Sequence, residues 1–304
     1  MVANAVLLFV AAPNVRAQLP SVRACHALAS FPPSGGVVLI GGARECGVGV
    51  LPDTAMWRWD GRAWSVVGPF TPGAREDALV TFDSRRGRLV LYGGRNGPRV
   101  FTDTWEWDGR TWSSHQSAQN PGPLEHAAIA FDSARGRVVV FGGGSRTGTR
   151  SARTWEWDGR EWTVRAEAGP PARVGHSMAW SPAHRAVLMY GGFAARQFVD
   201  LWKWSGTAWA QLSDRGPAET EGPSLVAFDR ALLLIGTPPG TTGSMRTWRI
   251  DDATFDPVQS AMAPSPTVGP AVAYDAVRRR VVWYGGGTVW EFDGAQWARV
   301  ELAR

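Results

Sequence analysis

The sequence predicts an all-β fold, a six-bladed β-propeller with four antiparallel strands in each blade. A Trp-rich block occurs six times along the chain, and an apolar run that ends in glycine precedes each copy. The chain also has 17 tryptophans against four tyrosines, and so many large side chains need a core divided into similar compartments. A repeat array of this kind makes one domain out of 304 residues.

The Trp-rich block supplies the last two strands of each repeat. It reads TWEWDGRTW at Thr104–Trp112 and TWEWDGREW at Thr154–Trp162, with Asp-Gly between two aromatic segments. Asp-Gly accepts the positive φ of a tight turn, so each block is expected to fold as a β-hairpin. The other copies lie at Met56–Trp64, Leu201–Trp209, Val289–Trp297 and, in a worn form, Thr247–Phe255.

The apolar run before each block supplies the second strand. Runs such as VVVFGG at Val138–Gly143 are continuous and β-branched, which fits strands buried on both faces. A polar turn joins each run to a preceding strand, as in Ala78–Gly94, so the first two strands form a hairpin as well. The other runs are Val37–Gly42, Leu89–Gly94, Val187–Gly192, Val281–Gly286 and Leu232–Thr237, which has lost the second glycine.

Each repeat is a contiguous segment of chain. We therefore expect the ring to close through packing between blades, without strand exchange between the two ends. The propeller is placed at residues 18–304, with blades at about 22–70, 74–118, 123–168, 172–214, 220–260 and 267–302.

Four short antiparallel strands with a glycine pair after the second resemble the kelch-repeat β-propeller family, in particular bacterial kelch motif-containing proteins. Arg-x-x-His at Arg23–His26 and Arg173–His176 adds to the resemblance, which covers about residues 20 to 304. The sequence departs from the family where tryptophan replaces the common tyrosine and where the fifth repeat lacks a glycine and a tryptophan. The resemblance implies that the first strand of each blade lines a central channel and the fourth lies at the rim.

Residues 1–17 differ from the repeats and are expected to be a signal peptide. Ala5–Ala12 is a short apolar core, and Val15–Ala17 offers the small residues of a cleavage site, which predicts export to the periplasm or the cell exterior. No basic residue lies near Met1, so a cytoplasmic location is the alternative. Eight apolar residues are too few to span a bilayer as a helix, and no other segment is a candidate.

Cys25 and Cys46 are the two cysteines, and both fall in the first repeat. The strand pattern brings them to the same rim of one blade. In an exported protein they are able to form a disulfide, and the alternative is two unpaired thiols.

The net charge of +5 comes from arginine, since Lys203 is the one lysine among 32 basic residues. The arginines recur at turns and form no dense basic run, so nucleic acid is not the expected ligand. We expect a monomer.

The loops after the second strands and the connections between blades share one face of the predicted ring, here called the long-loop face. Function often lies in the longer loops. The loop Gly144–Arg153 carries arginines and no acid, and guanidinium groups bind carboxylates through paired hydrogen bonds. The candidate ligand-binding residues are Arg44, Arg95, Arg99, Arg146, Arg150, Arg153 and Arg196. The alternative is a solvated surface that is rich in arginine.

The mouth of the channel is the second candidate site. Imidazoles and carboxylates at similar positions there are able to bind a metal or transfer protons, namely His26, Asp77, His126 and His176, with Glu76 and Glu125 beside them. The alternative is that these histidines brace neighbouring backbone and lie too far apart to share an ion, and we expect no metal and no other cofactor. The motifs HExxH, GxxxxGK[ST], GxSxG and paired CxxC are absent.

The sequence thus predicts a non-enzymatic propeller that binds a protein segment or an anionic glycan through its long-loop face. The alternative is a carbohydrate-active enzyme of the sugar epimerase or mutarotase kind, acting at the channel mouth.

Overall fold

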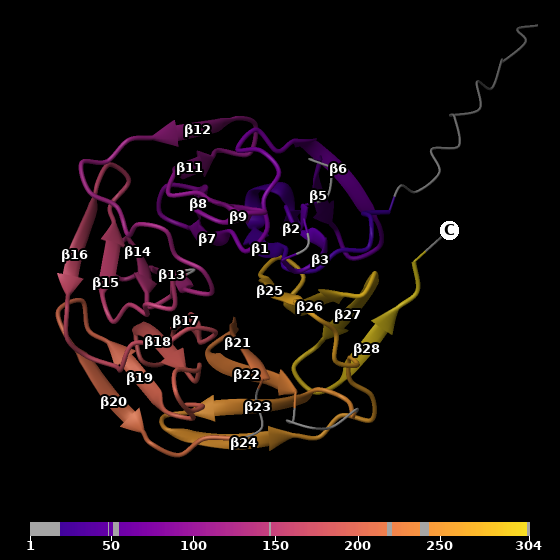
Figure 1. Cartoon of the computed structure of the whole chain (residues 1–304). Coiled ribbons are helices and arrows are strands. Elements are labelled where there is room, and N and C mark those ends of the chain that lie inside the picture. The colour runs from indigo at the N-terminus through magenta and orange to yellow at the C-terminus, as the bar shows by residue number, and fades with distance from the viewer. Residues whose placement is uncertain are drawn as a thin grey trace, which may run out of the picture.

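The computed structural model describes residues 19–47, 49–50, 55–145, 147–217, 221–237 and 243–302. Within these ranges, six four-stranded antiparallel sheets surround a central axis and form a closed ring (Figure 1). The predicted six-bladed, all-β propeller is therefore confirmed. The expected signal peptide at 1–17 and the candidate residue Arg146 lie outside the described residues. In the described part of the chain, no helix is long and apolar enough to cross a membrane.

Each blade uses its strands in chain order. Blade 1 contains β1 (Ala27–Phe31), β2 (Gly36–Ile40), β5 (Ala55–Trp59) and β6 (Trp64–Pro69); blade 2 contains β7 (Leu79–Asp83), β8 (Arg88–Tyr92), β11 (Thr104–Trp107) and β12 (Trp112–His115); blade 3 contains β13 (Ala128–Asp132), β14 (Arg137–Phe141), β15 (Thr154–Trp157) and β16 (Trp162–Ala166). Blade 4 contains β17 (Ser177–Ser181), β18 (Ala186–Tyr190), β19 (Leu201–Trp204) and β20 (Trp209–Ser213); blade 5 contains β21 (Glu221–Phe228), β22 (Ala231–Thr237), β23 (Arg246–Asp251) and β24 (Thr254–Val258); blade 6 contains β25 (Ala271–Asp275), β26 (Arg280–Gly285), β27 (Thr288–Phe292) and β28 (Trp297–Val300). Among the described residues, no strand is exchanged between the two ends of the chain.

The second strand of each blade packs against two neighbours at once. In β14, Val138 and Val140 pack with side chains of blade 2, whereas Val139 and Phe141 pack with side chains of blade 4. All four are fully buried. Because successive residues of a strand point to opposite faces, a continuous apolar run is what a strand between two neighbours requires.

The first strands line the central channel. β1 contacts β7 on one side and β25 on the other, so blades 1 and 6 meet where the ring closes. On the face with the short turns, the channel ends in a hollow of about 550 Å³ that all six first strands line.

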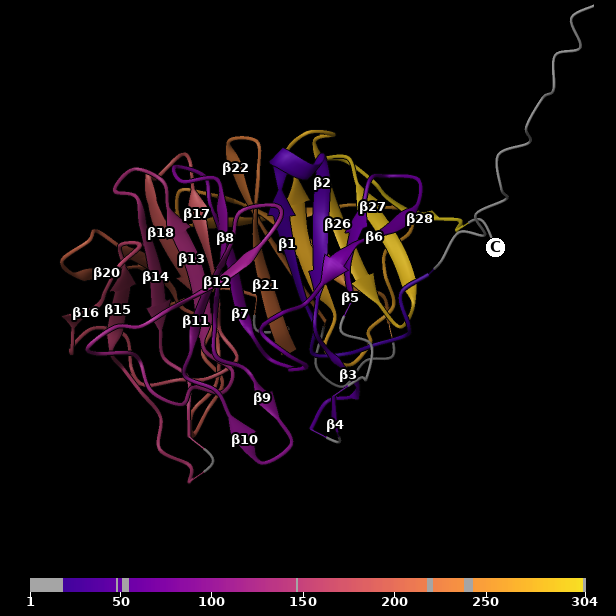
Figure 2. The same cartoon turned by 90° about the horizontal axis from the view of Figure 1, so that it is seen from above.

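The long-loop face carries two hairpins that the repeat pattern does not indicate. They are formed by β3 (Ala43–Glu45) with β4 (Gly49–Val50) and by β9 (Arg95–Asn96) with β10 (Arg99–Val100). Both extend beyond the blades on the same side of the ring (Figure 2). The loops of blades 1 and 2 therefore form raised edges beside the channel mouth.

A tryptophan of the third strand joins each of three blades to the blade before it. Trp157 Nε1 donates to Glu106 Oε1 at 2.8 Å, and Trp204 Nε1 donates to Glu156 Oε1 at 2.8 Å. Trp59 Nε1 makes the same bond to Glu291 Oε1 at 2.7 Å, across the closure of the ring. Each glutamate also pairs with an arginine from the first turn of its own blade. These arginines are Arg86, Arg135 and Arg278.

A tryptophan of the fourth strand makes a second bond between blades. Trp162 Nε1 donates to Thr104 Oγ1 at 2.8 Å, and the equivalent bonds are Trp209 to Thr154 and Trp297 to Thr247. In blade 1 the equivalent tryptophan is Trp64, which packs beside Val289 of blade 6. Its buried Nε1 has no hydrogen-bond partner among the described residues. The closing interface thus lacks the bond that these three interfaces have.

Replacing Val289 with threonine should supply the missing acceptor. Threonine in place of a buried valine usually destabilises a protein, but here we expect Val289→Thr to stabilise the fold by about 1 kcal/mol, since it satisfies the Trp64 indole. Urea unfolding of the wild type and the variant measures the change.

Thr247→Val is the matched control, because it removes the acceptor of Trp297 and should cost about 1 to 3 kcal/mol. A loss of stability in Val289→Thr would show that Trp64 gains no acceptor there, and an unchanged stability in Thr247→Val would show that Thr247 does not act as an indole acceptor.

Candidate functional site

The channel mouth and the long loops form one continuous surface. The residue pairs Ala24 and Ala43, Glu76 and Arg95, Glu125 and Gly144, and Val174 and Phe193 make isolated antiparallel bridges. Each bridge joins the segment before a first strand to the start of the long loop in the same blade. Side chains on these segments therefore face a common region.

A cavity of about 810 Å³ lies at the channel mouth and is lined by residues of all six blades. One position in each blade has left-handed backbone there, with φ between 51° and 66°, and these positions are Cys25, Asp77, His126, Gly175, Gly222 and Gly269. Left-handed backbone is uncommon for residues other than glycine. Three blades thus place a cysteine, an aspartate and a histidine at similar points around one ring.

His26 and His176 lie one residue after this ring position, so the four predicted side chains occupy two positions in the ring rather than one. Both rings border the cavity, yet they are only 7% and 5% exposed. His176 Nε2 lies 3.1 Å from the carbonyl oxygen of Phe141, and the His26 ring packs on Tyr284 with 5.2 Å between centroids. Through these contacts His176 touches blade 3 and His26 touches blade 6, so both rings lie at interfaces between blades.

Burial also decides the charge of these two histidines. Loss of hydration, followed by the nearby charge of Arg23, lowers the pKa of His26 from 6.5 to about 3. Burial and Arg173 lower the pKa of His176 to about 3 in the same way. Both imidazoles are therefore neutral near pH 7 and suited to packing rather than to proton transfer.

Arg95 neutralises the carboxylates of blade 2. Its Nε lies 3.1 Å from Asp77 Oδ2 and 3.5 Å from Glu76 Oε1. Glu76 is fully buried, and its Oε2 accepts a hydrogen bond from the backbone of Gly47 at 2.9 Å. Arg95 therefore ties the β9–β10 hairpin to the channel mouth, and its charge is already used.

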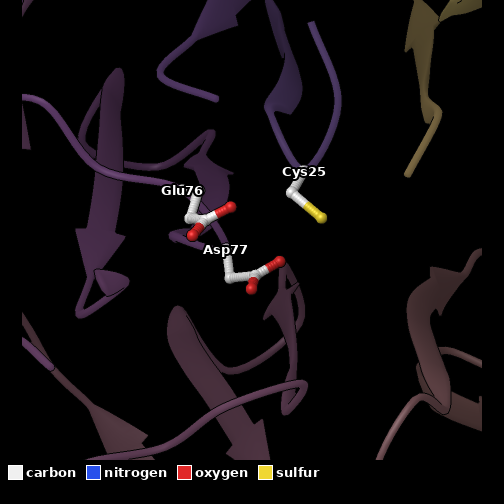
Figure 3. Close-up of side chains that lie close together, drawn as sticks. All are labelled: Cys25, Glu76 and Asp77. Carbon is white, nitrogen blue, oxygen red and sulfur yellow. The ribbon is translucent and has the colours of Figure 1, made fainter. Parts of the chain in front are cut away.

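Cys25, Glu76 and Asp77 gather at the same edge of the mouth (Figure 3). One ligand atom from each lies within 4.8 Å of the others, a spacing that a metal ion is able to bridge. The Sγ atoms of Cys25 and Cys46 are bonded at 1.99 Å, however, so the sulfur does not act as a thiolate ligand in this state. With Arg95 beside both carboxylates, the group is better suited to hold the β3–β4 and β9–β10 hairpins in place.

Blade 3 contributes the less constrained groups at the mouth. His126 is exposed, and Glu125 is partly buried with no hydrogen-bond partner for its buried Oε1 among the described residues. Five of the predicted arginines are exposed on the long loops of blades 1 to 4, namely Arg44, Arg99, Arg150, Arg153 and Arg196. Arg153 Nη2 lies 3.2 Å from Glu167 Oε1, an exposed pair that contributes little to stability.

Phenylalanines hold three of the exposed arginines. The guanidinium carbons of Arg99, Arg150 and Arg196 lie 4.6, 5.8 and 5.5 Å from ring centroids. The rings belong to Phe101, Phe193 and Phe198. Stacking on an aromatic face orients a guanidinium and leaves the N–H groups in its plane able to donate to a ligand.

Two buried arginines under the long loops were not anticipated from the sequence. Arg75 Nη1 lies 2.7 Å from Asp103 Oδ1, and Arg173 Nη2 lies 2.9 Å from Asp200 Oδ2. The ring of Phe101 or Phe198 stacks on the buried guanidinium with 4.0 Å to the centroid. The pattern Arg-x-Phe-x-Asp occurs at 99–103 and at 196–200, and its repetition is the feature from which the pairing could have been found.

The two neutral histidines predict how stability depends on pH. A folded pKa of about 3 against 6.5 means that the unfolded chain binds more protons between these values, so stability is complete above pH 6.5 and falls as the pH drops towards 3. Each histidine should contribute a slope of up to about 1.4 kcal/mol per pH unit. Unfolding by urea at several pH values from 7 to about 4.5 measures the slope.

His176→Gln should retain a donor to Phe141 and remove one of the two slopes. The same pH dependence in this variant as in the wild type would contradict the burial of a neutral His176.

Comparison with known proteins agrees with this architecture. No curated protein matches the chain. The family described as the KLHDC2/KLHL20/DRC7 Kelch-repeats domain matches residues 25–237, which include the first four blades and the first two strands of the fifth. The match covers more than half of the chain, and the chain therefore belongs to the kelch-repeat family of β-propellers.

Proposed function

We propose that this protein is a non-enzymatic binding propeller whose long-loop face holds an acidic protein segment or an anionic glycan. The observation that carries the proposal is the set of exposed arginines Arg44, Arg99, Arg150 and Arg196. Within the described residues, none of the four has a carboxylate partner within 4.0 Å. Five arginines that are less exposed are paired with acids, namely Arg75, Arg86, Arg135, Arg173 and Arg278.

The stacked arginines support recognition of a carboxylate or sulfate. Free arginine side chains lose much rotamer entropy on binding, and Arg99, Arg150 and Arg196 are already oriented by phenylalanine rings. A guanidinium held in this way donates two parallel hydrogen bonds to a planar anion. The cost of ordering is thereby reduced before the ligand arrives.

The alternative of a carbohydrate-active enzyme at the channel mouth has less support. His26 and His176 are buried and neutral, and Arg95 neutralises Asp77. Glu125 and His126 are the pair best placed for acid–base work at the mouth, and Glu125→Gln with His126→Ala should leave ligand binding through the arginines intact. An exported, monomeric protein is part of the proposal, and the Cys25–Cys46 disulfide favours an oxidising compartment.

Charge reversal tests the proposal. Arg99→Glu, Arg150→Glu and Arg196→Glu combined should reduce capture of the partner from an extract of the native cells by at least about tenfold, because three cationic groups become repulsive. The captured material is identified by mass spectrometry, and the melting temperature should stay within about 2 °C of the wild type, since all three side chains are exposed.

The matched control reverses three exposed arginines of the opposite face, Arg62, Arg110 and Arg160. Each of them directly follows the Asp-Gly pair of a turn between the third and fourth strands. This control has the same change in net charge and should capture the partner normally. Equal loss in both variants would point to net charge rather than to the long-loop face, and would contradict the proposal.

A further inference from the structure

Two backbone hydrogen bonds close the long loop of blade 3 in the same way as those of blades 2 and 4. Ser151 N donates to the carbonyl of Gly143 at 2.9 Å, as Phe101 N does to Gly94 and Phe198 N does to Gly192 at 2.8 Å. Gly142 N likewise donates to the carbonyl of Arg153, as the first glycines of blades 2 and 4 do to Asp103 and Asp200. Ser151 and Arg153 therefore stand where the neighbouring blades have phenylalanine and aspartate.

The third member of the set is replaced as well. The buried arginines, Arg75 in blade 2 and Arg173 in blade 4, stand two residues before the left-handed position of their blade. Leu124 occupies this place in blade 3. In those blades the arginine, the stacked phenylalanine and the aspartate together fill the space beneath the long loop. In blade 3 an apolar side chain, a small side chain and a cation take their places.

A hollow of about 580 Å³ lies at these three positions, because Leu124, Ser151 and Arg153 are all among its lining residues. Its volume is within the range of about 300 to 1,000 Å³ that is usual for ligand pockets. Pro123, Ala152 and Gly143 add apolar or backbone surface, and Arg150 stands at the side with its guanidinium 5.8 Å from the exposed ring of Phe193. The pocket thus has an apolar wall, two cationic side chains and one carboxylate, Glu167, which pairs with Arg153.

We propose that this blade 3 pocket is a subsite for an acidic peptide segment in which an aromatic residue lies close to an aspartate or glutamate. The aromatic side chain takes the volume that Phe101 and Phe198 occupy in the flanking blades. Its neighbouring carboxylate binds Arg153, whose charge is opposite to that of Asp103 and Asp200. The inference rests on the proposed function and assigns it a place and a ligand chemistry.

The sign of the charge favours this occupant over a cationic or neutral one. The Arg153 partner Glu167 is 67% exposed at its side chain, and Arg153 itself is 56% exposed, so the pair exchanges readily with a ligand carboxylate. Ser151 Oγ accepts from Arg153 N at 3.1 Å and retains its own hydrogen for a ligand oxygen. An apolar wall beside two guanidinium groups and a hydroxyl matches an aromatic ring beside a carboxylate.

Titration calorimetry with a defined peptide tests the subsite. The probe is the N-acetylated, C-amidated hexapeptide Gly-Phe-Gly-Asp-Gly-Gly, whose Phe-x-Asp spacing copies that of blades 2 and 4. We expect binding by the full chain, with about tenfold weaker affinity when the peptide aspartate is replaced by asparagine or the phenylalanine by alanine. Arg153→Gln should weaken binding by a similar factor, whereas Arg110→Gln, which changes an exposed side chain of the opposite face, should alter binding less than about twofold.

The decisive variant fills the pocket with the side chains of the flanking blades. Leu124→Arg, Ser151→Phe and Arg153→Asp combined should abolish peptide binding while the melting temperature is kept or raised, since the set already packs in blades 2 and 4. Unchanged binding in a folded triple variant would overturn the subsite. If that variant fails to fold, the comparison of Arg153→Gln with Arg110→Gln decides alone.

Failure of the subsite and failure of the proposed function are distinguishable. If the peptide fails to bind but a uronic-acid oligosaccharide binds and depends on Arg99 and Arg196, the peptide subsite is wrong and the binding face stands. If neither probe binds and the charge-reversed propeller captures the native partner as well as the wild type does, both are wrong.

Discussion

The hydrogen bond from a buried tryptophan to a glutamate of the preceding blade constrains three of the six interfaces between blades. An indole N–H in a dry interface needs an acceptor, and Glu106 and Glu156 supply it although each is only 2% exposed. A buried carboxylate in turn needs a cation, which Arg86 and Arg135 provide from the first turn. Each such interface thus depends on three side chains from two repeats: the tryptophan, the glutamate that accepts from it, and the arginine that pairs with the glutamate.

This dependence explains how the divergent blades remain compatible with the ring. Lys203 of blade 4 stands at the position of the glutamate, and blade 5 presents Ile250, whose side chain has no N–H group to satisfy. At the next interface, Arg249 of blade 5 replaces the glutamate and Phe292 of blade 6 replaces the tryptophan. The glutamate and the indole are therefore lost together. The interface between blades 1 and 2 departs from this rule. Arg58 of blade 1 replaces the glutamate, but blade 2 keeps Trp107, whose ring packs on Phe31 with 4.6 Å between centroids.

The sequence was sufficient to predict six contiguous blades because strand periodicity, glycine pairs and Asp-Gly turns are local properties that recur in every repeat. It was not sufficient to predict the partners of Arg75 and Arg173, because these lie 27 or 28 residues away on another loop. The sequence pattern aligns His26 and His176 with Asp77 and His126, which is one residue out of register. A left-handed backbone defines the ring position, and residue type does not reveal it where a cysteine, aspartate or histidine adopts this conformation. Exposure of individual arginines likewise depends on tertiary contacts, as the pairing of Arg95 illustrates.

A propeller with equivalent blades has an approximate rotational symmetry, and a ligand without that symmetry requires positions at which the blades differ. Substitutions in the strands are restricted by packing on both faces, so the differences collect where the backbone is shared but side chains meet solvent. Blade 3 combines several of them: Leu124, Ser151 and Arg153 in one pocket, with the exposed His126 at the adjoining channel mouth. The first three strands of this blade pair without a register shift, and such a rigid support is what allows a small set of exceptional side chains to be held in a fixed arrangement for a ligand.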